Sequence, residues 1–228
     1  MSKGSPNKLV YGIGFWSAVI ATLSVIASDI SMFVSWLVFP PVGAWRGIEA
    51  YAASFETTHI LSMIPGFFIA VTFAPLMLSI HYSAPEDKKI LTHLGLIFTA
   101  IYTAIQSINY YVELAVISPN ILIGETEGLA LFIWANPYSI FIALEGLGYG
   151  FMSLATLFVA PIFTKGKLER SIRWLFIVNG VIGIAGIIGY ALNIGYTIIL
   201  AGLVTWDILF PITTALLAVM FRRIRRTV

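Results

Sequence analysis

The chain of 228 residues contains no cysteine. It therefore offers no disulfide, no thiolate metal site and no cysteine nucleophile. Charged residues are also scarce, at 11%, whereas soluble domains carry about 25%. A water-soluble protein of this length could not cover its surface with 13 basic and 11 acidic side chains. The shortage excludes an ordinary soluble enzyme and a disordered chain, and a formal net charge of only +2 argues against a nucleic-acid partner.

Apolar residues are abundant instead, at 59% of the chain, and they occur in long runs. A membrane-spanning helix needs about 20 mostly apolar residues, so the runs predict an all-α integral membrane protein with a six-transmembrane-helix bundle in a single membrane domain, residues 1–228. The last two spans share one long run, and Asn193-Ile194-Gly195 is its natural turn. The six spans are expected at about residues 9–29, 57–83, 90–114, 138–163, 172–192 and 196–221.

The basic residues predict the orientation of these spans. All 13 except Arg46 fall in the N-terminal segment, in the turns after spans two and four, or in the C-terminal tail. Basic residues concentrate in cytoplasmic loops, so we expect a multi-pass protein of the cell membrane with both termini cytoplasmic. The apolar run after Lys8 is longer than the core of about 7–15 residues in a cleavable signal peptide, and we expect it to be retained as the first span.

Two outer loops are too long for tight turns. Residues 30–55 are rich in aromatic side chains and contain Pro40-Pro41, which is typical of a short interfacial or re-entrant piece. Residues 120–136 end in an apolar patch, and we expect this loop to fold back on the bundle.

Acidic residues show the opposite bias. All 11 except Glu86, Asp87 and Glu169 fall in the outer loops or the outer half of the membrane. Asp207 is expected roughly 21 Å above the inner end of the last span, at 1.5 Å per residue. Pro211, four residues on, cannot bond the Asp207 carbonyl and tends to bend the helix. A carboxylate, a free carbonyl and a bend together are typical of an intramembrane ion or substrate site.

Small and polar side chains also line one face of the third span. At 100° per residue nine of them lie within about 60° of Gln106, namely Thr92, Gly95, Thr99, Tyr102, Thr103, Gln106, Asn109, Tyr110 and Glu113. Lipid cannot satisfy such a face, so it must point into the bundle. Hydrogen bonds between helices account for the inner part of this stripe, whereas Gln106, Asn109 and Glu113 together exceed what packing requires.

The histidines give weaker patterns. Glu56 and His59 are expected side by side on the second span, and Glu-x-x-His is half of a di-iron motif. No second copy exists, so neither a metal nor another cofactor is expected. His81 and His93 flank the turn after the second span, where we expect them to be solvated rather than to clasp a haem.

Four stretches, 118–120, 124–131, 136–141 and 143–149, resemble a family of prokaryotic multi-pass membrane proteins with no known activity. The resemblance covers roughly residues 94–180 and implies a prokaryotic membrane setting. The expected layout also resembles the substrate-capture subunits of vitamin importers, in architecture only.

Three functions remain open from the sequence. The leading hypothesis is the binding or transport of a small solute or ion in an outward-facing acidic and aromatic pocket, and the acidic bias favours a cation. The alternative is a membrane enzyme acting on a lipid or sterol-like substrate, with His59 and a buried carboxylate as acid and base. The third is a structural or assembly protein. Partners are expected to be membrane lipids and the ligand, and a homo-oligomer or partner subunit stays open. The expected pocket lining is Asp207, Glu145, Glu113, Asn109, Gln106, Glu56, His59 and Tyr110.

Overall fold

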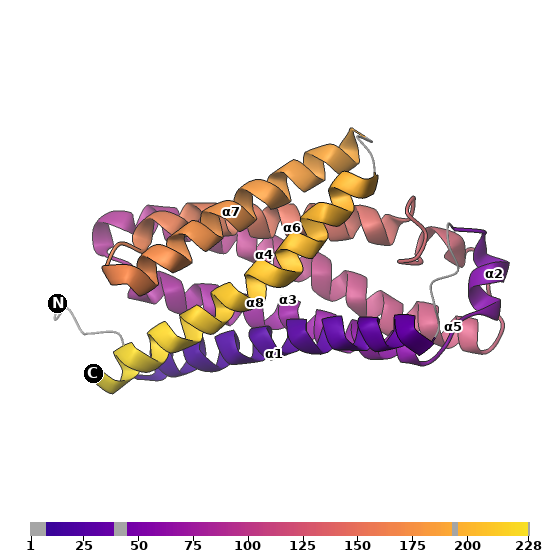
Figure 1. Ribbon diagram of the computed structural model, residues 1–228, viewed down its shortest axis with the longest axis horizontal. Coiled ribbons are helices and arrows are strands. Elements are labelled where there is room, and N and C mark those ends of the chain that lie inside the picture. The colour runs from indigo at the N-terminus through magenta and orange to yellow at the C-terminus, as the bar shows by residue number, and fades with distance from the viewer. Residues whose placement is uncertain (1–7, 39–44, 193–195, 228) are drawn as a thin grey trace.

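The computed structural model describes residues 8–38, 45–192 and 196–227. The predicted six long apolar helices are confirmed, and each is long and apolar enough to cross a membrane. They are α1 (Lys8–Val38), α3 (Thr58–Ser83), α4 (Lys89–Val112), α6 (Ile140–Val159), α7 (Gly166–Ala191) and α8 (Tyr196–Thr227), as Figure 1 shows.

Shorter elements connect or extend these helices. A π-helix, η2 (Glu113–Ile117), joins α4 to α5 (Ser118–Leu122), so the third span continues well beyond its predicted end at residue 114. The remaining short elements are α2 (Ile48–Ala53) and the 3₁₀ turns η1 (Glu86–Lys88), η3 (Leu129–Leu131) and η4 (Ala160–Ile162).

The first helix also differs from its predicted boundaries. It continues past Asp29 to Val38, because neither glycine nor proline occurs between Asp29 and Pro40 and a single carboxylate does not end a helix. The first part of the predicted interfacial segment is therefore helix α1. Pro40, Pro41 and the expected turn at Asn193-Ile194-Gly195 lie outside the described residues.

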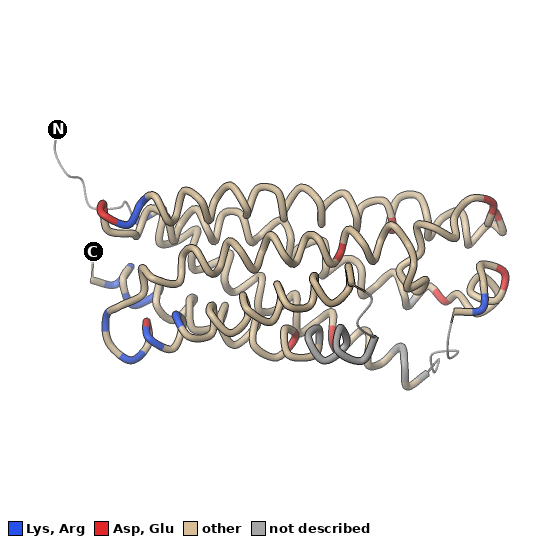
Figure 2. Tube along the Cα trace, turned by 90° about the horizontal axis from the view of Figure 1, so that it is seen from above, with Lys and Arg blue, Asp and Glu red and all other residues tan. Residues whose placement is uncertain are grey.

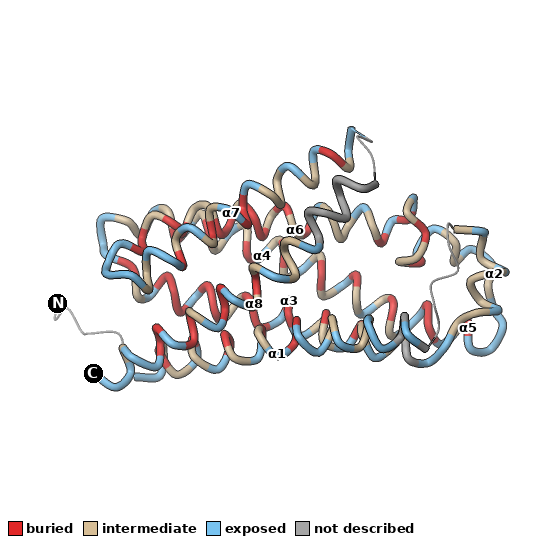
Figure 3. Tube along the Cα trace, viewed as in Figure 1, coloured by how far each residue is buried: buried red, intermediate tan, exposed pale blue. Residues whose placement is uncertain are grey.

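The long helices form a closed ring. Each packs against the preceding long helix in the chain, and α8 packs against both α7 and α1. In Figure 1, α8 crosses the bundle obliquely. The Thr22 and Thr214 hydroxyls share a hydrogen bond of 2.7 Å across the α1–α8 contact. Buried residues follow the inward faces of the helices, as Figure 3 shows.

The two ends of the bundle differ in charge. Lys and Arg gather at the end that holds the α3–α4 and α6–α7 turns and the end of α8, and we call this the basic end (Figure 2). The opposite end, which we call the cap end, is built from α2, α5 and η3. A second apolar core lies there, formed by Ile117, Ile121 and Ile133. Because Ile133 is fully buried, the prediction that residues 120–136 fold back is confirmed.

Candidate functional site

The polar face of α4 points into the bundle, as the sequence predicts. Toward the basic end it serves as contact between helices: His81 Nδ1 lies 2.7 Å from the Thr92 hydroxyl, and the Thr103 hydroxyl donates to the Ala70 carbonyl of α3 at 3.2 Å. This half of the stripe is accounted for by packing. The buried members of the whole stripe are Thr92, Gly95, Thr99, Tyr102, Gln106, Asn109 and Glu113.

Toward the cap end, the same face surrounds a carboxylate of α6. The Tyr110 hydroxyl donates to Glu145 Oε1 at 2.8 Å, and Asn109 Nδ2 donates to Oε2 at 3.3 Å. Gln106 Nε2 donates to the Glu145 backbone carbonyl at 3.1 Å. We call Gln106, Asn109, Tyr110 and Glu145 the Glu145 cluster. The structure thus brings together four of the eight predicted pocket residues.

Two glycines give these polar side chains their room. A Cβ at Gly148 would lie 2.6 Å from Gln106 Nε2, and a Cβ at Gly66 would lie 2.5 Å from the Tyr110 ring. Any larger residue would displace the side chain that packs there. Glycine at these two positions therefore allows α3 and α6 to approach α4 around the Glu145 cluster.

A closed circuit of five aromatic rings lies beside the Glu145 cluster. Tyr149, one helical turn from Glu145 toward the basic end, contacts Tyr102 at 6.0 Å and Trp206 at 4.7 Å between ring centroids. Trp206 stacks on Phe210 at 4.7 Å. Phe73 completes the circuit, 6.2 Å from Phe210 and 5.2 Å from Tyr102. We call these five residues the aromatic floor, because Tyr149 and Tyr102 lie one helical turn toward the basic end from Glu145 and Gln106.

Asp207 adjoins this floor on α8. It lies within electrostatic reach of Glu145 and of Asp29 on α1, and it has no hydrogen-bond partner among the described residues. Pro211 lies inside α8, so the Asp207 carbonyl lacks the usual helical partner, as the sequence predicts. Acidic groups from three helices therefore face the same region.

Among residues 8–38, 45–192 and 196–227, no basic side chain forms an ion pair with these acids. In the part of the chain that the structure describes, the only ion pair joins Lys89 and Glu86, at 2.6 Å, at the basic end. Glu145 is partly exposed and held only by neutral donors. A carboxylate of this kind within an apolar bundle favours a positively charged partner from outside the chain.

Glu113 lies apart from the Glu145 cluster. It begins the π-helix η2, has 1% exposure, and interacts with Tyr51 of α2 rather than with Glu145. The sequence places Glu113 on the correct face of the third span but does not reveal its separate surroundings.

Glu56 and His59 lie next to each other, but the His59 ring contacts the backbone of Glu56 and not its carboxylate. Glu56 precedes α3, which begins at Thr58, and the His59 N–H donates to the Glu56 carbonyl at 2.9 Å, so the two residues share the turn that leads into the helix. His59 Nδ1 lies 3.0 Å from the Glu56 backbone carbonyl, and its ring stacks on Phe55 at 5.6 Å. The described residues thus supply no acid–base pair at His59, and they contain no group of three His, Cys, Asp or Glu that could hold a metal.

The other two histidines differ from the prediction in part. His93 is exposed, as expected, but His81 is buried beneath α4 and bonded to Thr92. The last turn of α3 packs against the first turn of α4, and this contact removes His81 from solvent.

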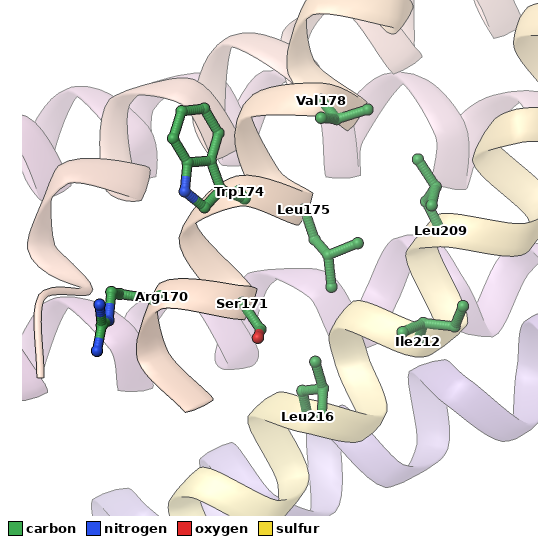
Figure 4. A pocket seen from close by; sticks show the side chains of 8 residues that line it. All are labelled: Arg170, Ser171, Trp174, Leu175, Val178, Leu209, Ile212 and Leu216. Carbon is green, nitrogen blue, oxygen red and sulfur yellow. The ribbon is translucent and has the colours of Figure 1, made fainter. Parts of the chain in front are cut away.

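A surface groove of about 560 Å³ runs between α7 and α8 (Figure 4). Its lining is apolar except for Arg170 and Ser171, and it includes none of the residues of the Glu145 cluster or the aromatic floor. Its other lining residues are Trp174, Leu175, Val178, Leu209, Ile212 and Leu216. This groove could not be predicted from the sequence, since its apolar residues follow the same spacing as any lipid-facing helix surface.

Fold and site together define an all-helical protein with six candidate membrane-spanning helices and an acidic, aromatic cluster among them. No family model, no curated protein and no solved structure matches the chain.

Proposed function

We propose that this protein is a multi-pass membrane protein, with cytoplasmic termini, that binds or transports a small cation at the Glu145 cluster. One observation carries the proposal. Both carboxylate oxygens of Glu145 accept hydrogen bonds from neutral groups, Tyr110 and Asn109, and no described residue forms an ion pair with it. Negative charge held among apolar helices is costly unless a positive partner binds.

The neighbouring rings favour an ammonium-type cation over a bare metal ion. Tyr149, Trp206 and Tyr102 present aromatic rings beside the carboxylate, and the faces of such rings attract alkylammonium groups. Asp207, within electrostatic reach of Glu145, adds negative potential on the α8 side. The proposed ligand is therefore a small amine or quaternary ammonium solute.

The orientation is proposed from the charge bias. Lys and Arg gather at the basic end (Figure 2), and such residues concentrate on the cytoplasmic side of membranes. The cap end then faces outward, and the cation enters the Glu145 cluster from that side.

Binding is tested with purified protein in lipid nanodiscs, titrated with methylammonium and tetramethylammonium chloride at constant ionic strength. Tryptophan fluorescence is the readout, since Trp206 lies in the aromatic floor beside the proposed site. Glu145→Gln keeps the shape of the side chain and removes its charge. Glu127→Gln, at an exposed position, is the matched control.

We expect saturable binding to the unaltered protein and to Glu127→Gln, and affinity at least about tenfold weaker in Glu145→Gln, the loss that about 1.4 kcal/mol produces. Absence of saturable binding of either cation, or equal affinity in Glu145→Gln, would overturn the proposal.

A further inference from the structure

A second buried polar group of residues lies at the cap end, apart from the Glu145 cluster. It combines Glu113 of η2, Tyr51 of α2 and Trp134, which follows η3. Tyr51 packs against the second apolar core, which contains Ile117, four residues after Glu113, and Ile133, the residue before Trp134. Three segments far apart in the chain therefore meet here.

These residues carry an unusual concentration of unsatisfied polar atoms. Glu113 Oε2, the Tyr51 hydroxyl and Trp134 Nε1 are all buried without a hydrogen-bond partner, and they are three of six such atoms in the described residues. The Trp134 indole N–H lies close enough to the Tyr51 hydroxyl to donate to it after a small shift, and the Glu113 carboxylate lies near the same hydroxyl. Buried polar groups in proteins are almost always hydrogen-bonded. Glu113 Oε2 has no donor among the described residues and its side chain has 1% exposure, so this oxygen points to a bound partner.

The local backbone supports the same conclusion. Glu113 is the first residue of a five-residue π-helix within an otherwise continuous helical span. Such π-helical turns are rare and occur frequently at functional sites. Here the turn redirects the chain into α5 and places Glu113, with 1% exposure, beneath α2.

The chemistry of the three groups defines the partner. The site offers a cation one carboxylate and one phenol oxygen, and the described residues give Glu113 no basic partner. The indole N–H of Trp134 is a donor only, so it supports the Tyr51 hydroxyl rather than the cation. Burial and the nearby carboxylate raise the pKa of Tyr51, so its hydroxyl keeps its proton and can both donate and accept. Aromatic rings of Trp45 and Phe55 pack around Tyr51. A carboxylate with aromatic neighbours suits an ammonium group.

We infer that Glu113, Tyr51 and Trp134 form a second site for a small ammonium cation, on the cap-end side of the Glu145 cluster. For the class of ligand this inference rests on the proposed function. Glu113 and Asn109 are four residues apart on the same buried face of one helical span, a rise of about 6 Å. The two sites are thus consecutive positions along the helical span that α4 and η2 form, and a cation that enters from the cap end meets Glu113 first.

The nanodisc titration with methylammonium chloride separates the two sites. Trp134→Phe identifies the part of the fluorescence change that comes from the second site. Glu113→Gln removes the charge with little change of shape, and Tyr51→Phe removes only the hydroxyl. Glu125→Gln, at an exposed position of the same end, is the matched control.

We expect Glu113→Gln to abolish the Trp134 component and to weaken binding there at least tenfold, while the component lost in Glu145→Gln persists. Tyr51→Phe should weaken the same component at least threefold, and it serves as the test if Glu113→Gln does not fold. Glu125→Gln should titrate like the unaltered protein.

Different results would overturn the second site and the binding of a cation at the Glu145 cluster. An unchanged Trp134 component in a folded Glu113→Gln or Tyr51→Phe protein overturns the second site, and so does a structure with only a water molecule between the three groups after soaking with methylammonium. Unchanged binding in Glu145→Gln together with loss in Glu113→Gln overturns the proposed function and leaves the second site standing.

Discussion

The hydroxyl of Tyr110 on α4 donates a 2.8 Å hydrogen bond to the Glu145 carboxylate on α6. Tyr110 bonds one carboxylate oxygen, and Asn109 donates to the other. The orientation of the Glu145 carboxylate therefore depends on two side chains of α4. Tyr110 is in turn held by close contact with Gly66 on α3. Three helices therefore determine where one negative charge points.

Removal of the Tyr110 hydroxyl should destabilise the bundle. Tyr110→Phe deletes a hydrogen bond to a carboxylate and should lower the free energy of unfolding by about 1–2 kcal/mol. Thermal unfolding in lipid nanodiscs measures the change. Tyr111→Phe is the matched control, because Tyr111 is 62% exposed and should leave stability unchanged. Equal effects of the two variants would contradict the assigned hydrogen bond.

Alanine substitutions at Gly148 and Gly146, two residues apart on α6, should have different effects on the free energy of unfolding. Gly148→Ala places a methyl group 2.6 Å from Gln106 Nε2 and should cost about 1–3 kcal/mol of unfolding free energy. At Gly146 a Cβ meets nothing within 4 Å, so Gly146→Ala should be neutral or stabilise the helix by up to about 1 kcal/mol. The same unfolding assay compares them, and a stable Gly148→Ala protein would show that Gln106 is free to move.

The contact between Thr22 and Thr214 can be measured with a double-mutant cycle. Thr22→Val and Thr214→Val each remove one hydroxyl of the 2.7 Å bond between α1 and α8. Hydrogen bonds between membrane helices are worth about 0.6 kcal/mol on average, and we expect a coupling free energy of that order. The control pair is Thr22 with Thr213, whose hydroxyl bonds the Leu209 carbonyl of its own helix. Its coupling should be close to zero, and equal coupling in both cycles would refute a specific bond.

The absence of cysteine makes the orientation directly testable. Lys165→Cys and Glu127→Cys introduce single thiols at exposed positions on the two sides of the predicted topology. A membrane-impermeant maleimide should label Glu127→Cys in intact cells and Lys165→Cys only after the membrane is permeabilised. The unaltered protein should not react. The reverse labelling pattern would place the basic end outside.

Much of the helical layout follows from the sequence because lipid imposes simple rules on it. Runs of apolar residues long enough to span a bilayer predict the six long helices, and the polar face of α4 predicts which side is buried. Helix ends were less predictable. Asp29 looks like a boundary, yet α1 continues to Val38, because a helix ends where its backbone is interrupted and not at each charged residue.

The candidate site was predictable only within single helices. Gln106, Asn109 and Tyr110 share a face by their spacing, but their meeting with Glu145 depends on which helix packs beside α4. The sequence did not indicate which other aromatic residues belong to the two sites. These are Phe73, Trp206 and Phe210 of the aromatic floor, and Tyr51 and Trp134 beside Glu113. Aromatic residues abound in this chain, and only tertiary packing brings particular rings together.

The closed ring of helices sets an order of assembly. Each long helix packs against the one synthesised just before it, so most contacts can form as the chain is made. The contact of α1 with α8 cannot, because it joins the first helix to the last. Until α8 is inserted, the Thr22 hydroxyl and the Tyr11 ring lack their partners Thr214 and Phe221. Before α8 is made, the chain therefore has an exposed face along α1, which is covered only when α8 packs against it.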